Sequence, residues 1–288
     1  MEHYTNNFEY RQSGSEIEIE KNEDFDLAKI FECGQCFRWV SDEKGIYRGV
    51  ARGKAIRIEE RGSSIFFSCT KEEFETIWRD YFDLDRNYAE IRGKLCINDY
   101  MRQAVDYGKG IRILRQDCWE ALCTFIFSQQ NNIPRIKKIV SALCNEFGEQ
   151  IEFDGQWYST FPAPETLAKY NADDLAPIRS GYRAAYIVDA AKAVSFGELD
   201  LASLPLNTPQ EARTALKRLR GVGDKVADCV MLFGLYMVDA FPMDVWMKRT
   251  VGEYFGDGFS PHQFSPYAGI AQQYIYYYAR RGIDANHR

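Results

Sequence analysis

The sequence predicts an α+β fold, in which an N-terminal antiparallel twisted β-sheet domain precedes a mostly α-helical part. The first observation is a series of β-rich runs separated by Arg-Gly turn dipeptides. These runs are residues 46–51, 54–59 and 64–69, with 37–40 as a further run before them. The second observation is a change to helical spacing of the apolar residues at about Lys71. We therefore expect a curved antiparallel sheet within residues 16–69, and helices from Lys71 to the C-terminus.

Capping signals mark where the helices of the second part begin and break. Asp117 stands before an apolar helical run, Ser180-Gly181 interrupts the pattern, and Ser260-Pro261 is expected to start the last helix. We divide the chain into an N-terminal β-sheet domain with flanking helices and a helical domain of two subdomains. The first domain is 1–116 and the second 117–288, whose subdomains are about 117–135 with 208–288, and 136–207.

The composition excludes several classes of protein. Of the three histidines only His262 lies away from the termini, so a histidine-dependent nucleophile or an H-E-x-x-H zinc site is not expected. The eight cysteines show no iron–sulfur spacing, and we expect reduced thiols with a structural or substrate-side role for Cys33 and Cys36. We expect neither a metal requirement nor an organic cofactor.

The sequence shows neither a membrane-spanning stretch nor a secretory signal. The longest apolar stretch runs from Cys229 to Val238, far short of the ~20 residues that cross a bilayer. The first residues lack the basic start and apolar run of a secretory signal. We therefore expect a cytoplasmic protein without membrane contact, which would be nucleoid-associated in a bacterium or nuclear in a eukaryote.

Charge is unevenly distributed along the chain. The formal net charge of −6 argues weakly against a nucleic-acid partner. However, the acidic excess is concentrated in residues 1–30, whereas residues 212–225 carry an excess of Lys and Arg. By itself such a basic run is most often a solvated helix face.

Residues 208–238 predict a helix-hairpin-helix motif. Thr208 to Glu211 is a capping box with proline at the first helical position, and we expect that helix to run through Leu219. Two glycines, Gly221 and Gly223, are expected to supply the positive φ angles of a hairpin. A second helix is expected from Asp224. Its apolar stripe would be Val226, Cys229, Val230, Phe233 and Met237. A hairpin of this kind before a helix N-terminus suits a phosphate group.

Lys225 and Asp244 form the candidate chemical pair. Lys225 lies in the first turn of the second helix, where the positive end of the helix dipole disfavours an ammonium and favours a nucleophilic amine. Asp244 reads as the N-cap of a following helix. The helix length and the extended return over residues 239–244 would bring Asp244 back beside Lys225. Taken alone, the two residues would equally suit a solvated lysine and a capping aspartate.

Several motifs together resemble a known family. Residues 219–247 read LRGVGDKVADCVMLFGLYMVDAFPMDVWM, which resembles the helix-hairpin-helix, Gly/Pro-Asp segment of base-excision DNA glycosylases, most closely the 8-oxoguanine DNA glycosylases. Other segments resemble the same family in the same order along nearly the whole chain. They are GQCFRW at 34–39, ILRQD at 113–117, SQQNNIPRI at 128–136, GYRAAY at 181–186 and YAGIAQ at 267–272.

The resemblance implies a bifunctional glycosylase and AP lyase that flips 8-oxoguanine out of duplex DNA, preferably opposite cytosine. Lys225 would attack C1′, form a Schiff base and promote β-elimination, and Asp244 would stabilise the developing positive charge. The substrate-binding positions that match are Gly34, Cys229, Phe233, Pro242, Gln272 and Tyr276. Among these, the Gly34 carbonyl would accept the N7 hydrogen of 8-oxoguanine, and Tyr276 departs from the phenylalanine of the family.

The resemblance also assigns DNA contacts outside the base pocket. Gln130, where the family usually has asparagine, would fill the gap left by the flipped base, and Tyr182 would wedge the duplex open. Arg135 and Arg183 would read the opposite cytosine. The hairpin glycines Gly221 and Gly223 would bind phosphate, and Trp246 stands where a phosphate-binding histidine is expected. The carbonyls of Lys217, Leu219 and Val222 could hold a cation.

Three alternatives remain beside this reading. A glycosylase for alkylated bases usually keeps the aspartate without the lysine, and the iron–sulfur branch for pyrimidine lesions needs cysteines that the chain lacks. The alternative of another class is a non-catalytic DNA-binding module that keeps the hairpin as a phosphate clamp. We expect duplex DNA containing 8-oxoguanine as the partner and a monomeric protein.

Overall fold

The computed structural model describes residues 8–284, and residues 1–7 and 285–288, with His3 and His287, lie outside the described part. Its N-terminal half contains a six-stranded sheet in the order β1-β2-β6-β5-β4-β3, in which every neighbouring pair is antiparallel. The strands are β1 (Tyr10–Ser13), β2 (Glu16–Glu20), β3 (Trp39–Ser41), β4 (Tyr47–Ala51), β5 (Lys54–Arg61) and β6 (Ser64–Phe67). The predicted α+β class and antiparallel sheet are confirmed.

The sheet differs from the prediction in two places. It begins with β1, ahead of residue 16, and the helix α1 (Leu27–Glu32) interrupts the segment that was expected to be all β. Asp26 explains the start of α1, because its side chain accepts a hydrogen bond from the Lys29 amide as an N-cap. The amphipathic run after it packs Ile30 and Phe31 onto the sheet.

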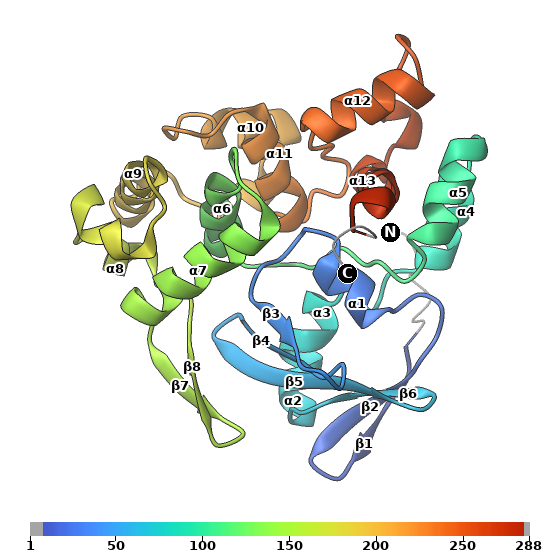
Figure 1. Cartoon of the computed structure of the whole chain (residues 1–288), viewed down its shortest axis with the longest axis horizontal. Coiled ribbons are helices and arrows are strands. Elements are labelled where there is room, and N and C mark those ends of the chain that lie inside the picture. Colours follow the sequence, from blue (N-terminus) through green and yellow to red (C-terminus); the bar gives the residue numbers. More distant parts are fainter. Residues whose placement is uncertain (1–7, 285–288) are drawn as a thin grey trace.

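One face of the sheet is covered by helices, as Figure 1 shows. Alternate residues such as Ile17, Ile58 and Phe67 point inward and are fully buried, as the two-residue period of a strand requires. They pack against Trp78 and Phe82. The covering segment is continuous and consists of α2 (Lys71–Glu73), η1 (Phe74–Trp78) and α3 (Arg79–Tyr81).

The rest of the described chain is mostly helical. Its helices are α4 (Tyr88–Leu95), α5 (Asp99–Tyr107), α6 (Cys118–Phe127), α7 (Ile133–Phe147), α8 (Pro164–Leu167), η2 (Ala172–Ile178), α9 (Arg183–Ser195), η3 (Leu204–Leu206), α10 (Pro209–Leu216), α11 (Asp224–Phe233), α12 (Val245–Tyr254), η4 (Pro261–Phe264) and α13 (Ala268–Asp284). The expected cap is present at Asp117, whose side chain accepts from the Glu120 amide at the start of α6.

Two expectations for this half were wrong. The chain does not stay helical, because β7 (Gln150–Phe153) and β8 (Gln156–Ser159) form a separate hairpin. Its turn uses Asp154 and Gly155, both with positive φ, a pattern that marks a two-residue hairpin loop. Ser260-Pro261 starts the short helix η4 and not the last helix, which begins at Ala268 after another turn.

The described residues form two hydrophobic clusters. The smaller lies between the sheet and α1–α3, and the larger joins α4–α13. Helices α4 and α5 precede residue 116, yet their buried residues belong to the larger cluster and α5 packs along α13. The hydrophobic clusters do not follow the boundary at residue 116, and the division into 1–116 and 117–288, with its subdomains, stays a prediction. No helix in the part of the chain that the structure describes has the length and apolarity to span a bilayer.

The helix-hairpin-helix is formed by α10 and α11. The capping box at Thr208 and Glu211 is present, but α10 ends at Leu216, earlier than expected. Only Gly221 takes a positive φ, of 83°, whereas Gly223 has φ −93° and is the N-cap of α11. Helix α11 ends at Phe233, so Met237 is not part of its stripe.

Candidate active site

A cavity lies where α6, α11, α13 and two loops meet. Its lining residues are Gly34, Phe125, Lys225, Cys229, Phe233, Pro242, Asp244, Gln272, Gln273 and Tyr276. The structure thus brings together both candidate catalytic residues and all six candidate substrate-binding residues. Phe125 and Gln273 were missed by the sequence reasoning. Because they come from α6 and α13, only long-range packing places them here.

The amine of Lys225 is held at the edge of this cavity. Lys225 is the second residue of α11, and its side chain is partly buried. Its Nζ donates a hydrogen bond of 2.9 Å to the Ser128 hydroxyl. The same Nζ lies 5.3 Å from the centroid of the Phe125 ring. The nitrogen therefore points toward α6, at the side where the cavity is lined by aromatic rings.

Asp244 reaches the cavity from the N-terminus of α12. Its Oδ1 accepts a hydrogen bond of 2.8 Å from the Met247 amide, so the predicted N-cap is present. The N-terminal dipole of a helix favours a negative charge at this position. The preceding segment, which includes Pro242, runs back from the end of α11 and lets Asp244 face the same cavity as Lys225. The carboxylate is fixed by the backbone and does not depend on Lys225 for its position.

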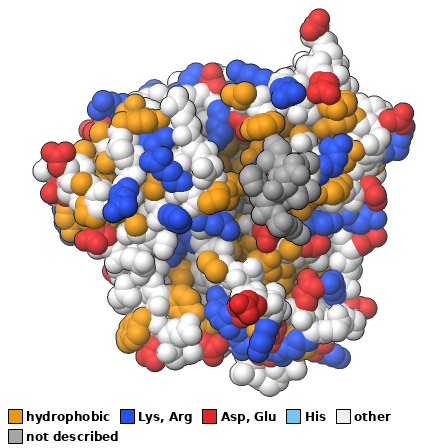
Figure 2. Space-filling model, in the orientation of Figure 1, with side chains coloured by type: hydrophobic (Ala, Val, Ile, Leu, Met, Phe, Trp, Pro, Cys, Tyr) orange, Lys and Arg blue, Asp and Glu red, His pale blue; other side chains and the backbone are white. Residues whose placement is uncertain are grey.

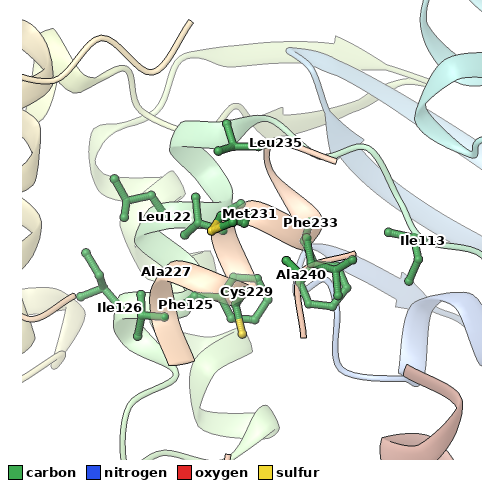
Figure 3. Packing of buried hydrophobic residues seen from close by; sticks show 14 of the residues in the cluster. Ile113, Leu122, Phe125, Ile126, Ala227, Cys229, Met231, Phe233, Leu235 and Ala240 are labelled. Carbon is green, nitrogen blue, oxygen red and sulfur yellow. The ribbon is translucent and has the colours of Figure 1, made fainter. Parts of the chain in front are cut away.

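Apolar side chains form one wall. The rings of Phe125 and Phe233 are stacked, with centroids 5.3 Å apart and planes inclined by 16°. Figure 3 shows Phe125 from α6 beside Cys229 from α11 in this packed layer. Cys229 is 3% exposed, and burial raises the pKa of its thiol to about 11. Its sulfur is therefore a neutral, polarisable wall atom at physiological pH.

Gly34 and Tyr276 face each other across the cavity. Gly34 has φ +87°, and a Cβ there would stand 3.3 Å from Cε1 of the Tyr276 ring. The backbone conformation favours glycine, and a larger residue would also press on the Tyr276 ring. The Tyr276 hydroxyl, which the family's phenylalanine would lack, accepts a hydrogen bond of 3.2 Å from Arg280 one turn later on α13. Burial raises the pKa of Tyr276.

Two neighbouring glutamines have different environments. Gln273 is buried and its Nε2 donates a hydrogen bond of 2.7 Å to the Cys33 carbonyl, which ties α13 to the loop containing Gly34. Gln272 is 5% exposed, and its Oε1 has no hydrogen-bond partner among the described residues. A buried acceptor without a partner costs about 1–3 kcal/mol. Gln272 is therefore suited to a polar ligand in the cavity.

The candidate DNA contacts gather near the C-terminus of α6 and the N-termini of α7 and α9. Gln130, Arg135 and Tyr182 are exposed, and Gln130 has φ +47°. Arg183 is different, because it is only 5% exposed and its guanidinium donates to backbone carbonyls. Those carbonyls belong to Ser180, Gln129 and Gln130. In the structure Arg183 thus holds the 129–130 loop and does not point its donors outward.

The hairpin and its basic run lie beside this region. Arg213, Lys217 and Arg220 form ion pairs with Asp228, Asp224 and Asp189, so much of the excess positive charge is compensated locally. Burial raises the pKa of Asp228 to about 6. Trp246 is 44% exposed at the start of α12. Figure 2 shows Lys and Arg side chains over the helical part of the face it presents.

The carbonyls proposed to hold a cation lie in the turn between α10 and α11. Of the three carbonyls at Lys217, Leu219 and Val222, that of Leu219 accepts a hydrogen bond of 3.1 Å from the Val222 amide. This bond closes the turn over residues 219–222, which contains Gly221. The cation therefore stays a prediction.

Two family models match consecutive parts of the chain. Residues 16–122 match "8-oxoguanine DNA glycosylase, N-terminal domain". Residues 123–262 match "HhH-GPD superfamily base excision DNA repair protein". The first match covers strands β2–β6 and the loop that contains Gly34, and the second covers the helix-hairpin-helix with Lys225 and Asp244.

Solved structures and a curated relative agree with these matches. MBOgg1, solved in complex with a low-affinity DNA ligand, is 41% identical with a TM-score of 0.91, and the alignment covers 96% of this chain and 99% of MBOgg1. The 8-oxoguanine glycosylase/lyase of Clostridium acetobutylicum, in complex with dsDNA containing cytosine opposite 8-oxoG, is 36% identical with a TM-score of 0.88, covering 96% and 98% of the two chains.

One curated relative is the N-glycosylase/DNA lyase of Saccharomyces cerevisiae, which is 32% identical over 250 residues. The alignment covers 77% of this chain and 66% of the yeast protein. The chain belongs to the 8-oxoguanine DNA glycosylase/lyase family of the helix-hairpin-helix superfamily of base excision DNA repair proteins.

Proposed function

We propose that this chain removes 8-oxoguanine from duplex DNA, preferably opposite cytosine, and then cleaves the strand, with Lys225 as the nucleophile for both reactions. The observation that carries the proposal is the presence of Lys225 and Asp244 in one cavity with Gly34, the Tyr276 ring and the unpaired amide oxygen of Gln272. Such a cavity suits a flipped purine base. One chain supplies every residue of this cavity, so we propose that a monomer suffices.

The reaction follows from the amine at the cavity edge. The lone pair of the Lys225 nitrogen forms a bond to C1′, while the bond from C1′ to N9 breaks and its electron pair leaves with the base, which gains a proton. The amine loses a proton, the sugar ring opens as O4′ is protonated, and an iminium links Lys225 to C1′. Loss of a C2′ proton then expels the 3′ phosphate by β-elimination. These steps need neither a metal nor an organic cofactor.

Asp244 would stabilise the charge that develops on the sugar as the base departs. The transition state resembles an oxocarbenium ion, and a fixed carboxylate opposes its positive charge. Because the Met247 amide holds Oδ1, the carboxylate is already oriented before DNA binds. Pre-organised charge of this kind costs no reorganisation during the reaction.

Recognition of the base would use one side of the cavity for stacking and another for hydrogen bonds. The Gly34 carbonyl would accept the N7 hydrogen, which guanine lacks, and the unpaired Oε1 of Gln272 would accept from the Watson–Crick edge. Cys229 and Tyr276 would lie on the two faces of the base, with Phe233 and Pro242 as further wall residues.

DNA outside the cavity would be bound by the exposed residues near the loop at 129–130. Gln130 would fill the gap in the duplex, Tyr182 would act as the wedge, and Arg135 would read the opposite cytosine. Arg183 would support recognition of the cytosine indirectly, by holding the 129–130 loop. It would contact the cytosine itself only if its guanidinium exchanged its bonds to the loop carbonyls for bonds to the base. The hairpin at Gly221 and Gly223 and the exposed Trp246 would contact the phosphate backbone.

The action of the enzyme on chromosomal DNA implies where it works. We propose that it acts at the nucleoid if the source is bacterial and in the nucleus if the source is eukaryotic. The competing candidate, a non-catalytic clamp, is favoured only by the hairpin, which binds phosphate equally well without chemistry. It predicts DNA binding without a covalent intermediate.

Borohydride reduction during incubation with an 8-oxoguanine duplex tests the nucleophile. The native chain should give a stable protein–DNA crosslink, because borohydride reduces the iminium to an amine. The Lys225→Gln variant should bind the same duplex and give no crosslink, measured by denaturing electrophoresis. A crosslink retained in Lys225→Gln would reject Lys225, and its absence from the native chain would favour the clamp.

The role of Asp244 can be separated from its structural role. Asparagine is as good an N-cap as aspartate, so Asp244→Asn should keep α12 intact while removing the charge. We expect DNA affinity within about threefold of native, and single-turnover excision slower by about a hundredfold, which is typical of losing one electrostatic stabiliser. Excision at the native rate would contradict this role.

A further inference from the structure

The Ser128 hydroxyl is the hydrogen-bond partner of the Lys225 amine. Ser128 is the C-cap residue of α6, and it does not line the cavity that contains the candidate site. Its Oγ donates a hydrogen bond of 2.7 Å to the carbonyl of Phe125 and accepts one of 2.9 Å from Lys225 Nζ. A chain of two hydrogen bonds thus links the nucleophile to the backbone of α6.

The direction of these two bonds limits what Ser128 can offer. A serine hydroxyl has a single hydrogen and two acceptor lone pairs. Because the hydrogen is used by the Phe125 carbonyl, the oxygen can only accept from Lys225. A neutral amine has two N–H groups and one lone pair. When one N–H is used by Ser128, the lone pair is directed away from Ser128.

The surroundings of Lys225 leave the cavity as the direction for that lone pair. On the α6 side the nitrogen already has the Ser128 oxygen and the face of the Phe125 ring as neighbours. Cys229 and Asp244 line the same cavity as Lys225, whereas Ser128 does not. The second N–H is taken up by the Cys229 thiol, with which Lys225 also forms a hydrogen bond, so a sugar that enters the cavity would meet the lone pair.

The position of Ser128 is itself fixed before DNA binds. Helix α6 is buried along nearly all its length, and the next two residues, Gln129 and Gln130, have carbonyls bound by Arg183 from α9. Ser128 therefore sits between a buried helix and a clamped loop. A lysine side chain that must be immobilised for reaction loses about 2 kcal/mol of rotamer entropy, and a fixed acceptor removes part of that cost beforehand.

We propose that Ser128 is a positioning residue for the nucleophile, which holds the Lys225 amine by one N–H so that its lone pair faces C1′ of the flipped nucleotide. The inference rests on the proposed function, because it assumes Lys225 as the nucleophile. Ser128 touches neither base nor sugar in this account, and acts only through the orientation of the amine.

Trapping on a duplex that already contains an abasic site isolates this step, because no base has to be recognised or released. With enzyme in excess and borohydride present, the Ser128→Ala variant should form the crosslink about tenfold more slowly than native, while Kd for the same duplex stays within about twofold. Ser128→Thr should trap within about threefold of native, because threonine keeps a hydroxyl that can donate to the carbonyl three residues back. Ser141→Ala, an exposed serine on α7, is the matched control and should behave as native.

Each other outcome would overturn the inference. Ser128→Ala trapping at the native rate would remove the positioning role, as would a change in Kd alone. Equal slowing in Ser128→Ala and Ser128→Thr, with unchanged thermal unfolding, would assign the effect to packing and not to the hydroxyl. Failure of the proposed function looks different, because the native chain itself would then give no crosslink or Lys225→Gln would keep it.

Discussion

At the residue scale, the cavity combines an unusual backbone conformation with an unsatisfied polar atom in the free protein. Gly34 takes a left-handed conformation opposite the Tyr276 ring, and Gln272 leaves its buried Oε1 without a partner in the described residues. Glycine adopts the Gly34 conformation without strain, whereas the unpaired acceptor of Gln272 costs folding free energy and is expected where a ligand completes the structure. The neighbouring Gln273 stabilises the fold instead, because its amide donates a hydrogen bond to the Cys33 carbonyl.

This contrast predicts opposite effects on stability for two similar substitutions. Gln272→Met removes an unpaired buried acceptor at nearly constant volume, so the free energy of unfolding should rise by about 1 kcal/mol, measured by urea denaturation. Excision of 8-oxoguanine should fall by about tenfold or more. Gln273→Met, the control, should lower the free energy of unfolding by about 1–2 kcal/mol because it frees the Cys33 carbonyl. Destabilisation of the same size by both variants would contradict this account.

At the element scale, the helix-hairpin-helix depends on one glycine for its shape and on another for its helix start. Gly221 has a positive φ, and a Cβ there would overlap the ring of Tyr186 on α9. Gly223 has an ordinary φ, and a Cβ there would meet nothing within 4 Å. The hairpin is therefore packed against α9 at Gly221 and open at Gly223, where a phosphate can approach the N-terminus of α11.

Alanine at the two positions should separate these roles. Gly221→Ala should lower the free energy of unfolding by about 2–3 kcal/mol, because the new methyl group is strained and must displace Tyr186. Gly223→Ala should cost less than about 1 kcal/mol, the loss of a preferred N-cap residue. Thermal unfolding of the two variants measures the difference. Equal destabilisation would show that the hairpin does not rest on Tyr186.

At the scale of the whole molecule, Arg112 joins the two hydrophobic clusters. It is fully buried, and its guanidinium lies 4.2 Å from the Tyr88 ring centroid of the larger cluster and 5.1 Å from that of Phe8 in the smaller. It donates to four backbone carbonyls on the chain segments between the clusters, those of Asp24, Phe82, Asp83 and Arg86. The sheet and the helices are thereby fixed relative to each other, which sets the place of Gly34 opposite α13.

Loss of this residue should destabilise the molecule as a unit. Arg112→Met keeps apolar contacts but removes the side-chain donor of four carbonyls, of which that of Asp83 still accepts from the Arg86 amide, so we expect the free energy of unfolding to fall by about 3–5 kcal/mol. Arg102→Met, which removes an exposed ion pair with Asp99, should change it by less than about 1 kcal/mol. Chemical denaturation followed by circular dichroism compares them. A small effect of Arg112→Met would mean that packing alone joins the two clusters.

Much of the local structure could be predicted because its signals lie within a few residues of one another. The capping box at Thr208, the N-caps at Asp117 and Asp244, and the start of α11 at Asp224 each depend on a short pattern. Some predictions failed because a local signal was ambiguous, and one because the Asp154-Gly155 turn signal was not used. Examples are the end of α10 and the β7–β8 hairpin within a helical stretch.

The sequence by itself determined the α+β class and the helix-hairpin-helix, since each follows from residue type and short spacing, and its resemblance to a known family singled out Lys225 and Asp244. Only the tertiary structure decided that Phe125 and Gln273 line the cavity, that Ser128 holds the Lys225 amine, and that Arg183 turns inward. These contacts join residues from separate elements, such as Ser128 and Lys225, which lie 97 positions apart. Their formation depends on how whole helices pack, and no short pattern in the chain contains that information.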